Sequence, residues 1–180
     1  PRLKAAMQNA ALVKRCEEAA GKLLRQSGIS LNTKRDFVNN AFVLTEVLKD
    51  IMDEAKTDAI TINSCMGTIM GMSKTTACLP LSLLNDDGYL AFCESDFVVI
   101  PSGILLHYIS GKPVFLNDPT YPHDDIVTLA HCTAPRKMDG KNDEPAKILT
   151  HFESDYGAAP KVEMKIGQIT TNIVPDFACK

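Results

Sequence analysis

One stretch of the chain, residues 77–118, restricts the fold more than any other part. It runs from an apolar helical pattern over 76–84 to a short apolar segment, Tyr89–Cys93, which ends abruptly at two acids. A second helical pattern over 97–110 and a second apolar segment over 113–116 follow. Helical and strand-like segments that alternate in this way predict a parallel sheet with helices packed against it.

The rest of the first 133 residues fits the same scheme. Strands are predicted at 58–63 and 125–130, and apolar stripes of helical period cover 3–26 and the segment after Thr33. These two helices are expected to cover the sheet. Residues 66–73, MGTIMGMS, are rich in glycine and methionine and are expected to form a loop. We therefore predict an α/β fold, Rossmann-like, with a parallel sheet and flanking helices.

The pattern changes after residue 133, which predicts a second region. Residues 134–146 are charged and rich in turn formers, as in a linker or an exposed loop. Residues 148–152 and 161–174 alternate like antiparallel strands. We expect an α/β domain over 1–133, then a linker and a partial β-barrel-like region over 134–180. Because the chain starts at Pro1 and not at Met, we expect it to be part of a longer protein.

Polar residues follow several of the predicted strands and form the candidate site. Glu94 and Asp96 follow one strand, Asn117 and Asp118 a second, and His131 a third. Open α/β sheets bind ligands at the carboxyl ends of their strands, so these side chains are expected to meet at one edge. Paired carboxylates suit Mg²⁺ or Mn²⁺, and they also suit proton transfer. The alternative is that either acid only caps the helix that begins near residue 97.

Composition excludes several classes of partner. The net charge of -3 gives no basic surface for nucleic acid, and no apolar run approaches the roughly 20 residues of a membrane span. The six cysteines are scattered without a C-x-x-C pair. That spacing argues against a zinc cluster and predicts reduced, mostly buried thiols in a cytoplasmic protein.

The segments ACLPLSLLNDDGYLAFCESDF, ILLHYISGKPVFLND and LAHCTAP together carry a family likeness. In this order they resemble the L-fucose isomerase-like sugar isomerases, over roughly residues 40–175. The resemblance implies the middle domain and the start of the C-terminal β domain of a longer, oligomeric enzyme. Such an enzyme interconverts aldoses and ketoses through an enediol, with a divalent metal, often Mn²⁺.

Carried over by position, Asp96 resembles the metal-binding carboxylate, and Glu94 is its neighbour in the same motif. We expect Asp96 and Glu94 to hold the metal, Glu94 to assist proton transfer, and Asn117, Asp118 and His131 to line the pocket of a small sugar. The chain departs from the family at Thr68, where relatives often carry a second carboxylate. That departure favours an alternative, a catalytically silent relative that binds a carbohydrate or has a structural role.

Overall fold

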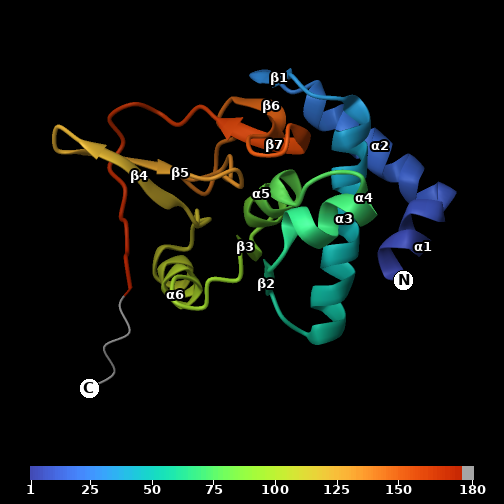
Figure 1. The fold of residues 1–180 in the computed structure, drawn as a ribbon, viewed down its shortest axis with the longest axis horizontal. Coiled ribbons are helices and arrows are strands. Elements are labelled where there is room, and N and C mark those ends of the chain that lie inside the picture. The colour runs from blue at the N-terminus through green and yellow to red at the C-terminus, as the bar shows by residue number, and fades with distance from the viewer. Residues whose placement is uncertain (176–180) are drawn as a thin grey trace.

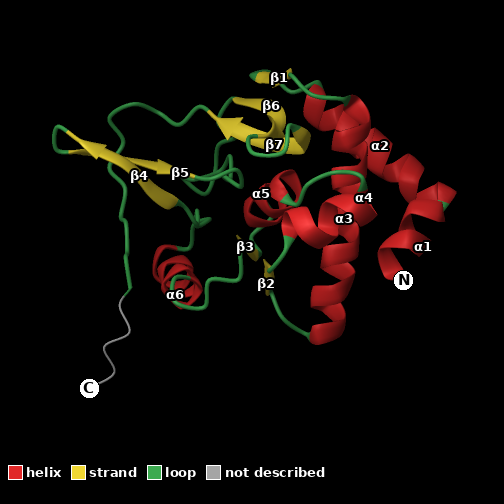
Figure 2. Cartoon of the chain, in the orientation of Figure 1, coloured by secondary structure: helices red, strands yellow, loops and turns green. Residues whose placement is uncertain are grey.

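The computed structural model describes residues 1–175. Figure 1 shows most of the helices gathered on one side of the molecule, one helix (residues 100–110) apart from them, and a long β-hairpin projecting on the opposite side. The fold is mixed α/β, as predicted, but the strands among residues 1–175 form three small sheets and not one parallel sheet (Figure 2). No helix among residues 1–175 has both the length and the apolar character needed to cross a bilayer.

The first helical stripe forms two helices where one was predicted. Helix α1 (Arg2–Gln8) and helix α2 (Ala10–Leu24) are separated at Asn9. The side chain of Asn9 accepts a hydrogen bond from the backbone N–H of Leu12 at 3.2 Å, which caps α2. The period of the stripe continues through this break, so periodicity alone does not reveal it.

The next helix, α3 (Arg35–Ala55), is the longest and was predicted correctly. Its buried residues divide between two hydrophobic clusters: Leu44 and Leu48 pack with Leu81 of α5, and residues nearer its start, such as Val38, belong to the second cluster. Thr33, just before the helix, donates its hydroxyl to the carbonyl of Gly157 at 2.8 Å. Thr33 therefore ties the start of α3 to a strand that lies far along the chain.

Two parallel strands position the candidate site. Strand β2 (Ala59–Ile62) pairs with strand β3 (Leu90–Cys93), and all four residues of β3 are buried. Helix α5 (Cys78–Asp86) lies between them in sequence and contributes residues such as Leu81, which is fully buried. This pair is the parallel part of the predicted sheet.

The glycine- and methionine-rich segment is helical, so the predicted loop is wrong. A π-helical turn, η1 (Cys65–Ile69), leads directly into the short helix α4 (Met70–Ser73). Ile69 and Cys65 pack against the cluster that α3 and α5 share. Apolar contacts on one face of the segment therefore outweigh the low helix propensity of its glycines.

The strand predicted over 113–116 is absent from the described residues. Val114 of this segment is buried in a cluster with Leu90, Phe92 and Ile100, where helix α6 (Ile100–Ser110) covers β3. The apolar residues of 113–116 therefore complete the packing around α6 without pairing to a strand. The chain forms a strand only afterwards, as β4 (Asp118–His123).

Strand β4 pairs with strand β5 (Ile126–Ala130) as an antiparallel hairpin. A strand over 125–130 was predicted, but as a buried member of a parallel sheet. All the residues of β4 and β5 are exposed, and Figure 1 shows the hairpin extending away from the helices. The hairpin is a separate two-stranded sheet, so β5 is not paired with the strands beside β3. The ends of β5 and β3 are therefore not aligned by a common sheet.

The last sheet joins one strand from the first part of the chain to two strands from its last part. Strand β6 (Ala146–His151) pairs in parallel with β1 (Ile29–Leu31) and antiparallel with β7 (Tyr156–Val162). Ile148 and Ala158 pack with residues of α2 and α3 in a second hydrophobic cluster.

The strand at 148–152 was predicted correctly, but the one at 161–174 was not, since β7 ends at Val162. Ile166 and Ile169 beyond it are fully or almost fully exposed and have no face to pack against. The domain boundary at 134–146 stays a prediction.

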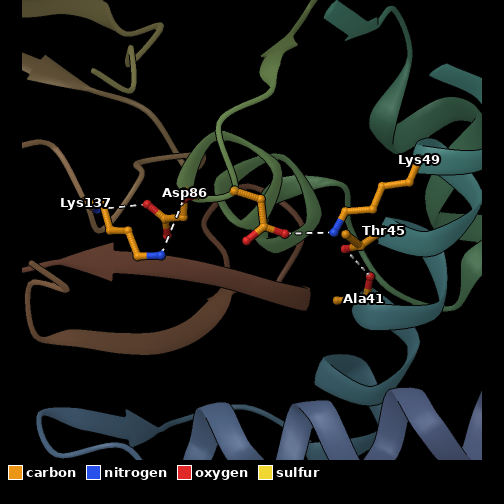
Figure 3. A network of polar contacts seen from close by, with 6 residues as sticks. Ala41, Thr45, Lys49, Asp86 and Lys137 are labelled. Atoms are coloured by element: carbon orange, nitrogen blue, oxygen red, sulfur yellow. Dashed lines mark hydrogen bonds and ion pairs between the residues drawn. The ribbon is translucent and has the colours of Figure 1, made fainter. Parts of the chain in front are cut away.

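Part of the predicted linker 134–146 is buried. Ala134 and Arg136 are almost inaccessible, and the hydroxyl of Ser82 donates to the carbonyl of Ala134 at 2.7 Å. Asp86, at the end of α5, accepts the backbone N–H groups of Arg136 and Lys137, each at 2.8 Å. Figure 3 shows the contact between Asp86 and Lys137. The segment therefore packs on the C-terminal end of α5, where the backbone N–H groups of Arg136 and Lys137 bind the Asp86 carboxylate.

Candidate functional site

The chain turns sharply at the end of β3, and this turn presents the first candidate residue. Glu94 and Ser95 both have left-handed backbone conformations, with φ of 68° and 49°. The backbone N–H of Ser95 donates to the hydroxyl of Thr61 on β2 at 3.1 Å. A left-handed backbone conformation is strained for residues other than glycine, and two occur here in succession. The contact with Thr61 helps to hold them in place.

Glu94 and His131 meet, as the sequence predicted. Oε1 of Glu94 lies 3.6 Å from Nε2 of His131. The imidazole is 5% exposed and the carboxylate is 61% exposed, so the pair spans the boundary between protein and solvent. Nδ1 of His131 lies 3.0 Å from the hydroxyl of Thr133, which fixes the orientation of the ring.

The surroundings of His131 favour its charged form. Burial lowers the pKa of His131, but the hydrogen bond with Cys132 and the charges of Cys132, Glu94 and Asp118 outweigh burial and raise it overall. Asp118 pairs with Ala130 at the base of the hairpin, next to His131 in sequence. The structure thus brings the charge of Asp118 to the imidazole.

Asp96 has the capping role that was the alternative interpretation of its position. Its Oδ1 accepts the backbone N–H groups of Val98 at 2.8 Å and Val99 at 3.1 Å, directly before α6. Within residues 1–175, no group of three or more ligand atoms within 4.8 Å of one another includes Asp96. The arrangement therefore does not fit the manganese site predicted on Asp96 and Glu94.

The predicted site residue Asn117, and Thr68, where the family often carries an acid, are also not joined to the pair. The side-chain amide of Asn117 donates to the carbonyl of Phe115 at 2.9 Å, so it stabilises its own turn. Thr68, which stands where relatives often carry an acid, lies inside the π-helical turn η1. The contacts around Glu94 and His131 do not use either residue.

Sequence reasoning missed a cluster of thiols beside this pair. We call Cys65, Cys78, Cys93 and Cys132 the thiol cluster. Cys65 and Cys132 both raise the pKa of Cys78, and Sγ of Cys132 lies 3.8 Å from Nδ1 of His131. The four residues come from η1, α5, β3 and the segment after β5, so their spacing in the sequence gives no motif.

The thiols of the cluster differ in acidity. The hydrogen bond with Cys78 lowers the pKa of Cys132 to about 5, with help from His131 and against the effect of burial. The same kind of contact lowers the pKa of Cys65 to about 7. Those hydrogen bonds, together with burial, raise the pKa of Cys78, and burial raises that of Cys93 to about 12. Cys132 is therefore the thiol that ionises most readily.

Two sets of side chains in this region have the geometry of ligand groups. Sγ of Cys78, Sγ of Cys132 and a ring nitrogen of His151 lie within 4.8 Å of one another. Cys93, Glu94 and His131 form a second set by the same measure. Both sets are rich in sulfur and nitrogen, which are the ligands of soft and borderline metals rather than of Mg²⁺ or Mn²⁺.

A separate hollow of about 390 Å³ lies beside β1 and the start of α3. Phe37 and Tyr156, whose rings are 4.4 Å apart, are among the residues that line it. None of its lining residues belongs to the thiol cluster or to the pair of Glu94 and His131.

No protein-family model, curated protein or solved structure matches the chain.

Proposed function

We propose that the chain supplies a general acid–base pair, Glu94 and His131, to a site that isomerises a small sugar between its aldose and ketose forms. The observation that carries the proposal is the 3.6 Å separation of the Glu94 carboxylate from Nε2 of His131. The family resemblance over roughly residues 40–175 supplies the substrate class. The Rossmann-like arrangement and the oligomeric, cytoplasmic enzyme of that family stay predictions.

The two groups suit the two proton transfers that the reaction needs. The carboxylate of Glu94 takes the proton from the carbon next to the sugar carbonyl, while His131 in its charged form donates a proton to the carbonyl oxygen, giving a neutral enediol. Glu94 then returns its proton to the former carbonyl carbon, and His131 recovers its proton from the neighbouring hydroxyl. An acid and a base held in fixed positions typically contribute about 10²–10⁴-fold to such a step.

Solvent exchange tests this proposal more sensitively than turnover does. The chain is incubated with aldopentoses and 6-deoxyhexoses in D₂O, and deuterium at C2 is followed by NMR. We expect exchange above the uncatalysed rate, and a loss of about 10²-fold or more in Glu94→Gln. Glu17→Gln, which changes an exposed acid of α2, serves as the matched control and is expected to exchange at the original rate.

Exchange no faster than in buffer, from a chain whose circular dichroism shows that it is folded, would contradict the enzymatic proposal. So would an equal loss of exchange in Glu94→Gln and Glu17→Gln. The first experiment therefore separates a specific role of Glu94 from a general effect of surface charge.

A second candidate function is carbohydrate binding without catalysis. Its support is that Asp96 caps the start of α6, while Thr68 stands where a second acid would be expected. Saturation-transfer NMR distinguishes this function from the first. Binding of a sugar without any deuterium exchange supports the silent binder, whereas exchange that depends on Glu94 supports the isomerase.

A further inference from the structure

We infer that Cys78, Cys132 and His151 form a site for a soft or borderline divalent metal ion of the Zn²⁺ type, with Cys65 as its fourth ligand. The inference does not rest on the proposed acid–base function, although its ligand Cys132 lies 3.8 Å from Nδ1 of His131. It also differs in chemistry from the manganese site that the family resemblance implies, because its ligands are sulfur and nitrogen.

The geometry of the three ligand atoms carries the inference. They lie within 4.8 Å of one another, and they come from the start of α5, the segment after β5 and the end of β6. Around a tetrahedral zinc ion, with Zn–S near 2.3 Å and Zn–N near 2.0 Å, neighbouring ligand atoms are roughly 3.3–3.8 Å apart. A contraction of at most about 1–1.5 Å brings the three atoms into that arrangement.

Cys65 lies beside this set, but its sulfur is not among the atoms that are within 4.8 Å of one another, so it has to move closer to serve as the fourth ligand. Its thiol hydrogen-bonds with Cys78, and its sulfur accepts the backbone N–H of Ala77 at 3.2 Å. A backbone N–H that points at a ligand sulfur is a usual outer contact of a thiolate site. Three cysteines and one histidine form one of the common structural zinc sets.

His151 is already oriented for the role. Its Nδ1 lies 3.0 Å from the hydroxyl of Ser154. Nε2 is therefore the ring nitrogen that remains available to bind a metal. Metal-binding histidines almost always engage their other ring nitrogen with such a partner, which holds the ring in place. Cys78 is 2% exposed and both other residues are partly buried, so the site is shielded but reachable from solvent.

The site would also add to the contacts, such as that of Ser82 with Ala134, that hold the segment after the hairpin on α5. The hairpin β4–β5 is exposed along its length, and Cys132 lies just after it. A metal ion bound to Cys132, Cys78 and His151 would tie that segment to α5 and β6. This is the usual effect of a structural zinc ion, which adds its binding free energy to folding.

Cobalt(II) is the probe for the test because its absorption reports both geometry and thiolate ligation. The full chain, fully reduced and freed of metal, is titrated with Co²⁺ under anaerobic conditions. We expect the strong visible bands of tetrahedral cobalt and a thiolate charge-transfer band in the near ultraviolet, both abolished by Zn²⁺. Cys132→Ser and His151→Gln should lose them, and Cys65→Ser should weaken the charge-transfer band.

Matched controls come from the same chain. Cys16→Ser changes a buried cysteine of α2, and His123→Gln changes a histidine of the exposed hairpin; both should keep the full spectrum. Ser154→Ala, which removes only the outer partner of His151, should weaken Zn²⁺ binding by about 10–100-fold.

A folded, reduced chain that gives only the weak spectrum of octahedral cobalt would overturn the inference. Tetrahedral bands that survive in both Cys132→Ser and His151→Gln would overturn it as well. An unchanged spectrum in Cys65→Ser would contradict the assignment of the fourth ligand.

Discussion

Oε1 of Glu94 lies 3.6 Å from Nε2 of His131, although α6 and the whole β4–β5 hairpin separate the two residues in the sequence. One partner is mostly exposed and the other almost completely buried. This contact joins the end of β3 to the segment after β5. The predictions that follow concern the elements that place these two ends together.

The first prediction concerns Asp96 as a helix cap. Asp96→Ala removes the acceptor of two backbone N–H groups and is expected to lower the free energy of unfolding by about 1 kcal/mol. Asp96→Asn keeps an oxygen at the same place and should cost only a few tenths of a kcal/mol. Urea denaturation measures both. Equal losses in the two variants would show that the charge matters more than the cap.

The second prediction concerns the pH dependence of stability through Asp86. Burial raises the pKa of Asp86 from 3.8 to about 6, against the opposing effect of the N–H groups of Lys137 and Arg136. The folded chain therefore binds the Asp86 proton more tightly than the unfolded chain does. Its contribution to stability is fully present below about pH 4 and is lost as the pH rises through about 6.

Asp86→Asn should remove this part of the pH dependence. The difference in unfolding free energy between about pH 4 and about pH 7.5 should change by on the order of 2 kcal/mol relative to the original chain. Asp50→Asn, at an exposed position of α3, is the control and should leave the difference unchanged. Parallel pH profiles for the original chain and Asp86→Asn would contradict the prediction.

The third prediction concerns the close approach of β7 to the start of α5. Gly157 has φ of 72°, and a Cβ atom there would lie 2.5 Å from the backbone nitrogen of Thr76. Gly157→Ala should therefore cost about 3 kcal/mol or more, from backbone strain and overlap together. Gly88→Ala, where φ is 91° and nothing lies within 4 Å, should cost only about 1 kcal/mol.

Thermal or urea unfolding measures the difference between these two glycines. Because Thr76 lies just before Cys78, the larger effect at Gly157 would also show that this contact positions α5 beside β6 and β7. Losses of the same size in both variants would mean that the backbone conformation alone matters at Gly157.

Helical periodicity and the main strands were predictable because local patterns determine them. The helix over 35–55 buries one face continuously, and β3 is short and wholly apolar, so both follow from the order of residues. The sequence also predicted that Glu94 and His131 lie close together, and their side chains are 3.6 Å apart. That prediction assumed a single parallel sheet, which the described strands do not form.

The remaining features depend on contacts between distant segments. Residues 113–116 have a strand pattern, but Val114 is used to cover β3 together with α6. The thiol cluster combines residues from four separate elements, so no spacing rule reveals it. His151 gave no sign of a partner in the sequence, because its neighbours Cys78 and Cys132 approach it only once β6 packs beside α5.

A double-mutant cycle on solvent exchange tests the central claim, that Glu94 and His131 act as one acid–base unit. The rate of deuterium incorporation at C2 of the sugar is compared for the original chain, Glu94→Gln, His131→Gln and the double variant. If the two residues work as a unit, the double variant exchanges about as slowly as the slower single variant. Independent losses that multiply in the double variant would contradict the claim.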